Sequence, residues 1–288
     1  MRPPRRFAFH FLLGLGLVLM ACRMIRPRPA AGFRPEALAA MDQAVASHLA
    51  AGRLPGGVFW LEHQGQRHHR AYGSRALEPV REPMTEDTLF DAASLTKVLA
   101  TTPSVMRLVE QGRLDLESPV ARHLPGFAAH GKGDIRIRHL LTHTSGLRPG
   151  LSLAGGWEGW EEAIRRACDE KPTQPPDTRF VYSDINFIVL GELVRTVSGR
   201  ELDAFARDEV FRPAGMRDTG YRRGGSGGDV ARVAPTERQG DGTVLRGVVH
   251  DPTARRMGGV AGHAGVFTTA ADVARFSRML LHGGRAEG

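Results

Sequence analysis

The sequence predicts a mixed α/β (α+β) fold, in which an antiparallel sheet is flanked by helices and a helical subdomain lies beside it. Two short runs, 57–63 and 68–73, have strand-like composition on either side of a turn at Gln64-Gly65-Gln66. Most of the remaining chain has helical periodicity instead. Since two strands alone form a marginal sheet, we expect this sheet to be incomplete, with its other strands beyond Gly288.

The helices are placed by apolar spacing and by their end signals. They are expected to begin at Pro35, Ala93, Asp184, Leu202 and Thr269. Gly52, Gly112 and Gly199 end the first three, because glycine readily adopts the left-handed conformation that follows a helix. Pro103 lies inside the second helix and predicts a bend there. Residues 222–229 are rich in glycine and arginine and predict a flexible surface loop.

The first 32 residues predict an export leader and a tether, and residues 33–288 a single domain. Arginines precede an apolar run from Phe7 to Ala21, which suits a secretory signal. The run ends in Leu19-Met20-Ala21-Cys22, which resembles a bacterial lipoprotein cleavage box. We therefore expect an exported, periplasmic or envelope protein with Cys22 as a candidate lipidation site that anchors it to a membrane surface. A plain signal cleaved near Ala30-Ala31, or an uncleaved anchor, stays open.

The net charge of +8 does not indicate nucleic-acid binding. Six arginines lie within the first 32 residues, and without them the chain carries only +2. A nucleic-acid-binding domain carries its basic excess on its folded part. We therefore expect no nucleic-acid partner.

The strongest chemical signal is Ser94-Leu95-Thr96-Lys97 at the start of a predicted helix. Residues three apart share one face of a helix, so Ser94 and Lys97 are neighbours. The positive end of the helix favours negative charge near Ser94, as in attack on a carbonyl group. Only Lys97, Lys132 and Lys171 are lysine among 39 basic residues. Lysine can give up a proton and act as a base, whereas arginine cannot.

A second signal is Tyr182-Ser183-Asp184 at a junction between a loop and a helix. Ser183 or Asp184 suits a helix cap. Alternatively, the Tyr182 phenol lies beside Ser94 and relays its proton to the leaving group.

Together these two motifs resemble the β-lactamase-like serine hydrolases, which include class C β-lactamases, D-alanyl-D-alanine carboxypeptidases and related esterases. The segments 138–147, 211–216 and 262–269 are similar to that family as well. The resemblance implies a β-lactamase/penicillin-binding-protein fold with Ser94 as acylated nucleophile, Lys97 as base partner and Tyr182 as proton relay. The Ser94 N–H would be half of the oxyanion hole.

Two further positions are candidate substrate-binding residues. Asp184 stands where the family often has asparagine, which weakens a claim of β-lactam hydrolysis because an amide donor has become a carboxylate. His263-Ala264-Gly265 fits the letters of the family's third motif, although its position before the last helix suggests that the true motif lies beyond Gly288.

Other reactive residues are predicted to be structural. His68, His69, His139 and His143 show no metal-ligand spacing, and Cys168 is expected in the core. We expect no cofactor, no metal and a monomer. The predicted function is hydrolysis of an ester or a D-amino-acid peptide, or of a β-lactam, through a Ser94 acyl-enzyme. The alternative is a non-catalytic envelope protein that binds cell-wall peptide, or an inactive fragment.

Overall fold

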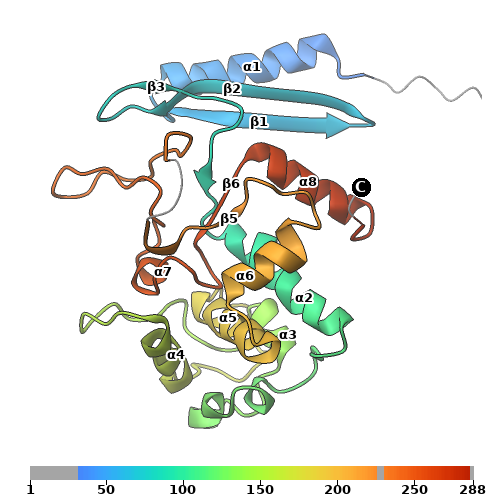
Figure 1. Ribbon diagram of the computed structural model, residues 1–288, viewed down its shortest axis with the longest axis vertical. Helices are drawn as coiled ribbons and strands as arrows, with labels where there is room; N and C mark the ends of the chain where they lie inside the picture. The colour runs from blue at the N-terminus through green and yellow to red at the C-terminus, as the bar shows by residue number, and fades with distance from the viewer. Residues whose placement is uncertain (1–31, 226–229, 286–288) are drawn as a thin grey trace, which may run out of the picture.

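The computed structural model describes residues 32–225 and 230–285, and its upper layer is built on a hairpin (Figure 1). Strands β1 (Gly56–His63) and β2 (Gln66–Ala76) pair antiparallel through a two-residue turn. Gln64 and Gly65 in this turn have φ of 48° and 78°, the left-handed pair that suits the twist of a hairpin. Helix α1 (Pro35–Ala50) lies over one face of the hairpin, and α8 (Ala270–Leu281) lies against β1 on the other side.

Four very short strands complete the two sheets of the described residues. Strand β3 (Glu82–Pro83) extends the hairpin. Strands β4 (Phe90–Asp91), β6 (Val266–Thr268) and β5 (Gly220–Tyr221) form a second sheet in the order β4-β6-β5. Sequence periodicity did not predict these strands, because two or three residues are too few to show alternation.

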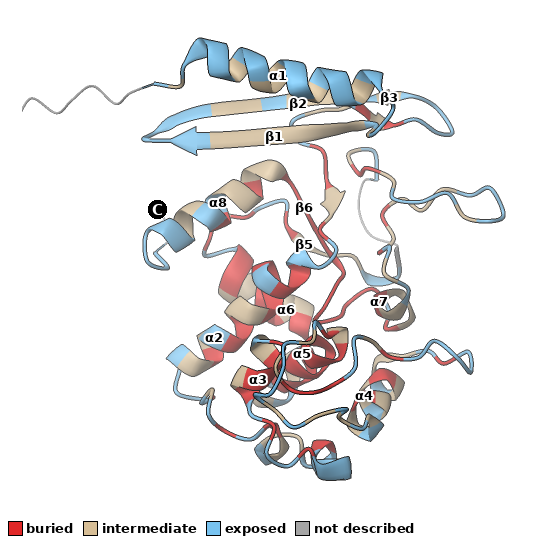
Figure 2. Cartoon of the chain, turned by 180° about the vertical axis from the view of Figure 1, so that it is seen from behind, coloured by how far each residue is buried: buried red, intermediate tan, exposed pale blue. Residues whose placement is uncertain are grey.

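The lower part of the molecule is helical and holds most of the core. Its helices are α2 (Thr102–Glu110), α3 (Ile137–Leu141), α4 (Trp160–Asp169), α5 (Asp184–Ser198), α6 (Leu202–Ala206) and α7 (Pro252–Arg256). Short 3₁₀-helical segments occur at Val120–Arg122, Pro125–Gly131 and Arg223–Gly225, and the second is interrupted by a kink at Ala129 and His130. Helix α5 is the centre, since residues 185–194 are all buried and face neighbours on every side. Figure 2 shows this concentration of buried residues, in contrast to the more exposed hairpin and α1.

The helix that carries the Ser94 motif differs from the expected continuous helix beginning at Ala93, since Ala93 lies in a turn and the helical residues begin at Leu95. Residues Lys97–Thr101 form a π-helical turn immediately before α2. Pro103 lacks the N–H that the α-helical pattern requires, and a wider turn accommodates this loss. A π turn therefore ends two residues before Pro103, where the sequence predicts a bend. A second π turn, Arg207–Phe211, continues α6.

The predicted helix starts at Asp184 and Leu202 are confirmed. Helix α1 begins at Pro35, and Gly199 closes α5 in the left-handed conformation with φ of 71°. Thr269 caps α8 by accepting a hydrogen bond from the Asp272 N–H. Cys22 and the predicted leader lie outside the described residues, as does part of the predicted loop at 222–229. Among the helices described, none has the length and apolarity needed to cross a bilayer.

Candidate active site

The turn before Ser94 presents this serine to solvent. Ala93 has φ of 46°, an unfavourable value for a residue with a β-carbon. Asp91 stabilises the turn, because one carboxylate oxygen accepts from the Ala93 N–H at 2.8 Å and the other from the His250 N–H at 2.7 Å. Ser94 is exposed at the beginning of the helix that follows.

Lys97 lies one turn further along and is almost completely buried, with 3 % of its surface exposed. Its Nζ is 3.0 Å from Ser94 Oγ, 3.2 Å from the His263 carbonyl oxygen and 2.7 Å from Asp184 Oδ1. The first two atoms accept hydrogen bonds from the amine, and Asp184 forms an ion pair with it. The serine oxygen and the amine are thus in direct contact, as the sequence spacing predicts.

The second predicted motif reaches the same place from the beginning of α5. Ser183 caps this helix and accepts from the Asn186 N–H, so Asp184 starts the helix and Tyr182 precedes it. The Tyr182 ring centroid lies 4.7 Å from Lys97 Nζ, and 44 % of this tyrosine is exposed. Its phenol makes no hydrogen bond to another described residue. The fold therefore brings Ser94, Lys97, Tyr182 and Asp184 together.

His263 is near these residues, but its side chain is buried and pairs with Asp251 instead of being open to a substrate. The imidazole is 1 % exposed, and its Nε2 lies 2.8 Å from Asp251 Oδ1. The group that His263 offers to Lys97 is its backbone carbonyl. Residues 260–269 are all buried, and within this range Gly262 lies between Thr101 and α5.

His143, which is predicted from the sequence to be a structural histidine, lies next to the site. Its ring lies 4.6 Å from the Tyr182 ring, and its Nδ1 accepts from the Ser183 N–H at 3.1 Å. Burial, together with the positive charge of Lys97, lowers the pKa of His143 below its usual value, although Asp184 opposes this. The ring is therefore neutral at pH 7. Its position in the Thr142-His143-Thr144 loop gave no periodic signal.

One group of possible metal ligands occurs among the described residues. Ligand atoms of Asp184, Asp251 and His263 all lie within 4.8 Å of one another. The Lys97 amine already pairs with Asp184 there. His139 instead pairs with Asp177, at 3.0 Å.

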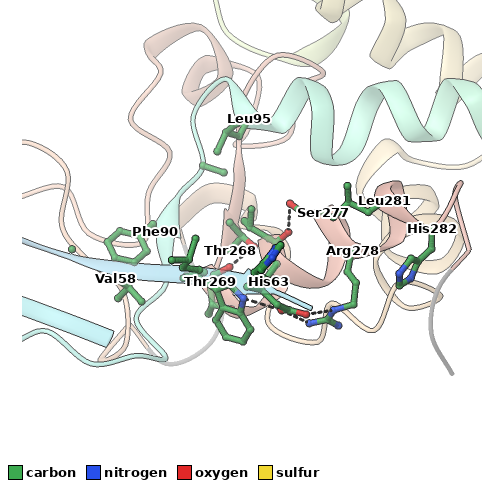
Figure 3. Close-up of a pocket in the computed structure, with 18 of the residues that line it drawn as sticks. Val58, His63, Phe90, Leu95, Thr268, Thr269, Ser277, Arg278, Leu281 and His282 are labelled. Atoms are coloured by element: carbon green, nitrogen blue, oxygen red, sulfur yellow. Dashed lines mark hydrogen bonds and ion pairs between the residues drawn. The ribbon is translucent and has the colours of Figure 1, made fainter. Parts of the chain in front are cut away.

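A groove of about 1070 Å³ lies elsewhere, between β1 and α8. Figure 3 shows its lining, which includes Val58 and His63 of β1 and Ser277, Arg278 and Leu281 of α8. Leu95 contributes to its wall, but Ser94, Lys97 and Tyr182 do not. Chemistry rather than volume therefore identifies the candidate active site.

Known proteins match most of this chain. The family model described as Beta-lactamase matches residues 41–288. A "Putative D-alanyl-D-alanine carboxypeptidase" of Escherichia coli (strain K12) is 30% identical over 291 residues, which cover 88% of this chain and 66% of that protein. An N-acetylmuramyl-L-alanine amidase of Bacillus subtilis (strain 168) is 34% identical over 290 residues, with 88% and 65% covered. The chain thus spans about two thirds of the length of these curated relatives.

Solved structures agree on the fold. A class C β-lactamase from Rhodobacter sphaeroides superposes with a TM-score of 0.70 at 23% identity, covering 86% of this chain and 67% of that one. A hydrolase described as having promiscuous acyltransferase activity gives 0.71 at 26% identity, covering 88% and 74%. The chain belongs to the beta-lactamase family of hydrolases and has the fold shared by β-lactamases and penicillin-binding proteins.

Proposed function

We propose that the chain hydrolyses an ester or a D-amino-acid peptide through an acyl-enzyme on Ser94. The observation that carries the proposal is the 3.0 Å contact between the exposed Ser94 hydroxyl and the buried Lys97 amine. In its neutral form the amine accepts the hydroxyl proton while Oγ attacks the substrate carbonyl. The Ser94 N–H at the helix start supports the resulting oxyanion.

Tyr182 is the proposed proton relay. When the tetrahedral intermediate collapses, the bond to the alcohol or amine breaks and the leaving group needs a proton. The Tyr182 phenol is exposed, lies beside Lys97 and has no competing hydrogen bond to a described residue. Water then attacks the acyl group and returns Ser94 to its free form.

Asp184 is the proposed substrate contact at the mouth of the site. Its side chain is 30 % exposed, so it can meet both Lys97 and a bound molecule. A carboxylate accepts hydrogen bonds and does not donate them. Asp184 therefore favours a substrate that presents an N–H or O–H group, and it argues against β-lactam hydrolysis as the main activity.

The names of the relatives support a substrate from the cell wall and a location in the cell envelope. One relative is named for D-alanyl-D-alanine cleavage and another for an N-acetylmuramyl-L-alanine amide. A signal-like leader would deliver the chain to that compartment.

We propose lipidation of Cys22 as the membrane anchor. The variant Cys22→Ser should then be released from isolated membranes, and an unchanged membrane fraction contradicts this.

Intact-mass spectrometry after treatment with a fluorophosphonate tests the nucleophile. We expect one adduct on the wild-type chain and none on Ser94→Ala. A fluorescent penicillin in parallel tests whether β-lactams also acylate Ser94. A folded wild-type chain that forms no adduct with the fluorophosphonate would contradict the proposal and favour the non-catalytic binding protein.

A further inference from the structure

Residues 262–266, which lead into β6, make four hydrogen bonds to residues 92–101 around Ser94. Thr101 Oγ1 donates to the Gly262 carbonyl at 2.7 Å, and Lys97 Nζ donates to the His263 carbonyl at 3.2 Å. The Val266 N–H donates to Thr96 Oγ1 at 3.1 Å, and the Val266 carbonyl accepts from the Ala92 N–H at 2.8 Å. This segment is therefore attached to both sides of Ser94.

The opposite side of the segment is packed against α5 with no spare room. A β-carbon at Gly262 would lie 1.9 Å from the Phe187 carbonyl oxygen, much closer than atoms can approach. Backbone therefore contacts backbone at this point. The segment cannot retreat from Lys97 toward α5.

The His263 side chain fixes the orientation of the segment at the residue that contacts Lys97. Its Nε2 meets Asp251 Oδ1 at 2.8 Å, and the same oxygen accepts from the Ala254 N–H at 2.7 Å, capping α7. His263 Nδ1 is buried and has no hydrogen-bond partner among the described residues. An unpaired buried nitrogen is unfavourable for stability alone, which indicates that the residue is kept for another reason.

The three acceptors around Lys97 pull its amine in different directions. Asp184 is charged and lies nearest, at 2.7 Å, so it attracts the amine more strongly than the neutral Ser94 hydroxyl does. Lysine has a flexible stem and can rotate toward the stronger partner. The His263 carbonyl holds one of the N–H groups and so limits this rotation.

We propose that His263, held by Asp251, is a positioning residue that keeps the Lys97 amine directed at Ser94 through its backbone carbonyl. The inference rests on the proposed function of Ser94 and Lys97. Because His263 acts through Lys97, its loss should slow acylation without weakening the binding of the reagent.

Two pairs of variants separate the hydrogen bond from the mere presence of a side chain. His263→Gln keeps an N–H donor for Asp251, whereas His263→Leu has none. Asp251→Asn keeps the oxygen that accepts both hydrogen bonds, whereas Asp251→Ala loses it. For each variant the rate of fluorophosphonate labelling is measured at several reagent concentrations. This dependence gives the binding constant KI and the maximal rate kinact.

We expect His263→Leu and Asp251→Ala to lower kinact by about tenfold to 100-fold, as small displacements of a catalytic group do. KI should be unchanged, and His263→Gln and Asp251→Asn should retain most of the rate. Equal loss in both members of each pair, or full kinact in His263→Leu, would overturn the proposal. Melting temperatures show whether a loss follows unfolding instead.

A second measurement does not depend on catalysis. The chain has only three lysines, so ¹³C labelling of lysine gives a spectrum with few Cε signals. We expect His263→Leu to move the Lys97 signal while those of Lys132 and Lys171 stay in place. An unmoved Lys97 signal overturns the positioning role even if the wild-type chain is not acylated. If the wild-type chain does not react with the fluorophosphonate but His263→Leu still moves the Lys97 signal, only the proposed function is rejected.

Discussion

The chain buries two lysine amines, and their surroundings differ in a way that separates structure from chemistry. Lys132 is 0 % exposed, and its Nζ donates to three backbone carbonyls, those of Ala129, Cys168 and Glu170, at 2.8, 2.8 and 2.6 Å. Lys97 has only one carbonyl partner, and its others are a carboxylate and an exposed serine hydroxyl. Lys132 joins the turn at 125–131 to the end of α4, whereas Lys97 contacts a side chain that can react.

This comparison corrects one argument from composition. The scarcity of lysine was one reason to expect a chemical role for Lys97, and the contact of its amine with Ser94 fits that expectation. Lys132 is equally rare and more deeply buried, yet its partners are all peptide carbonyls that cannot take part in proton transfer. Burial lowers the pKa of Lys132 from its usual value, although Cys168, Asp169 and Glu170 oppose this, and the hydrogen bonds of the amine all go to backbone carbonyls. The partners of a lysine, not its rarity or burial, indicate its role.

The largest expected effect is that of Lys97→Arg. Arginine keeps the positive charge but cannot release a proton to act as a base. We expect the rate of Ser94 acylation to fall by about 10²–10⁴-fold, the usual contribution of a general base. Labelling kinetics measure this loss, and circular dichroism checks the fold. Wild-type labelling in this variant would mean that Lys97 is no base.

Lys132→Met should affect stability rather than acylation. The methionine fills a similar space but leaves three partly buried carbonyls without their donor. We expect the free energy of unfolding in urea to fall by about 1–3 kcal/mol, with normal labelling of the folded fraction. A specific loss of labelling in a fully folded variant would remove the distinction between the two lysines.

A smaller effect concerns the stability of the Lys97 site at acidic pH. The pKa of His143 is lowered in the folded chain, first by burial and then by Lys97. Below the ordinary histidine value the unfolded chain binds a proton that the folded chain refuses, so stability falls as the pH falls. His143→Asn keeps an acceptor for the Ser183 N–H but does not titrate. Urea unfolding from about pH 7.5 to about pH 5.5 should show a shallower loss in this variant than in the wild type. If the unfolding free energies of the variant and the wild type had the same pH dependence, His143 would not be the group responsible.

The smallest expected effect reports the charge of Lys97 itself. Lys97→Met removes a neighbouring positive charge, so the pKa of His143 should rise toward its usual value, while burial still holds it below that value. Lys132→Met should leave this pKa unchanged. Titration of the His143 ring protons by NMR measures both. No change in Lys97→Met would show that the Lys97 amine is uncharged in the resting protein.

By itself the sequence determined the features that depend on near neighbours in the chain. The spacing of Ser94 and Lys97 on one helical turn, the caps at Ser183 and Thr269, the glycine end of α5 and the hairpin turn at Gln64-Gly65 all follow from local geometry. The family could also be predicted from the sequence, because several of its motifs occur in the right order. Local rules suffice where the interacting groups are only a few residues apart.

The tertiary structure decided which distant groups surround Lys97. No periodicity relates Asp184, the His263 carbonyl or Asp251 to Lys97, and the short strands β4, β5 and β6 have no signal of their own. The predicted role of His263 is corrected for the same reason. The His263-Ala264-Gly265 motif suggested a substrate-binding side chain, whereas the fold buries the ring and pairs it with Asp251. Long-range packing of the segment before β6 between the Ser94 helix and α5 fixes these contacts, and only the folded chain contains that packing.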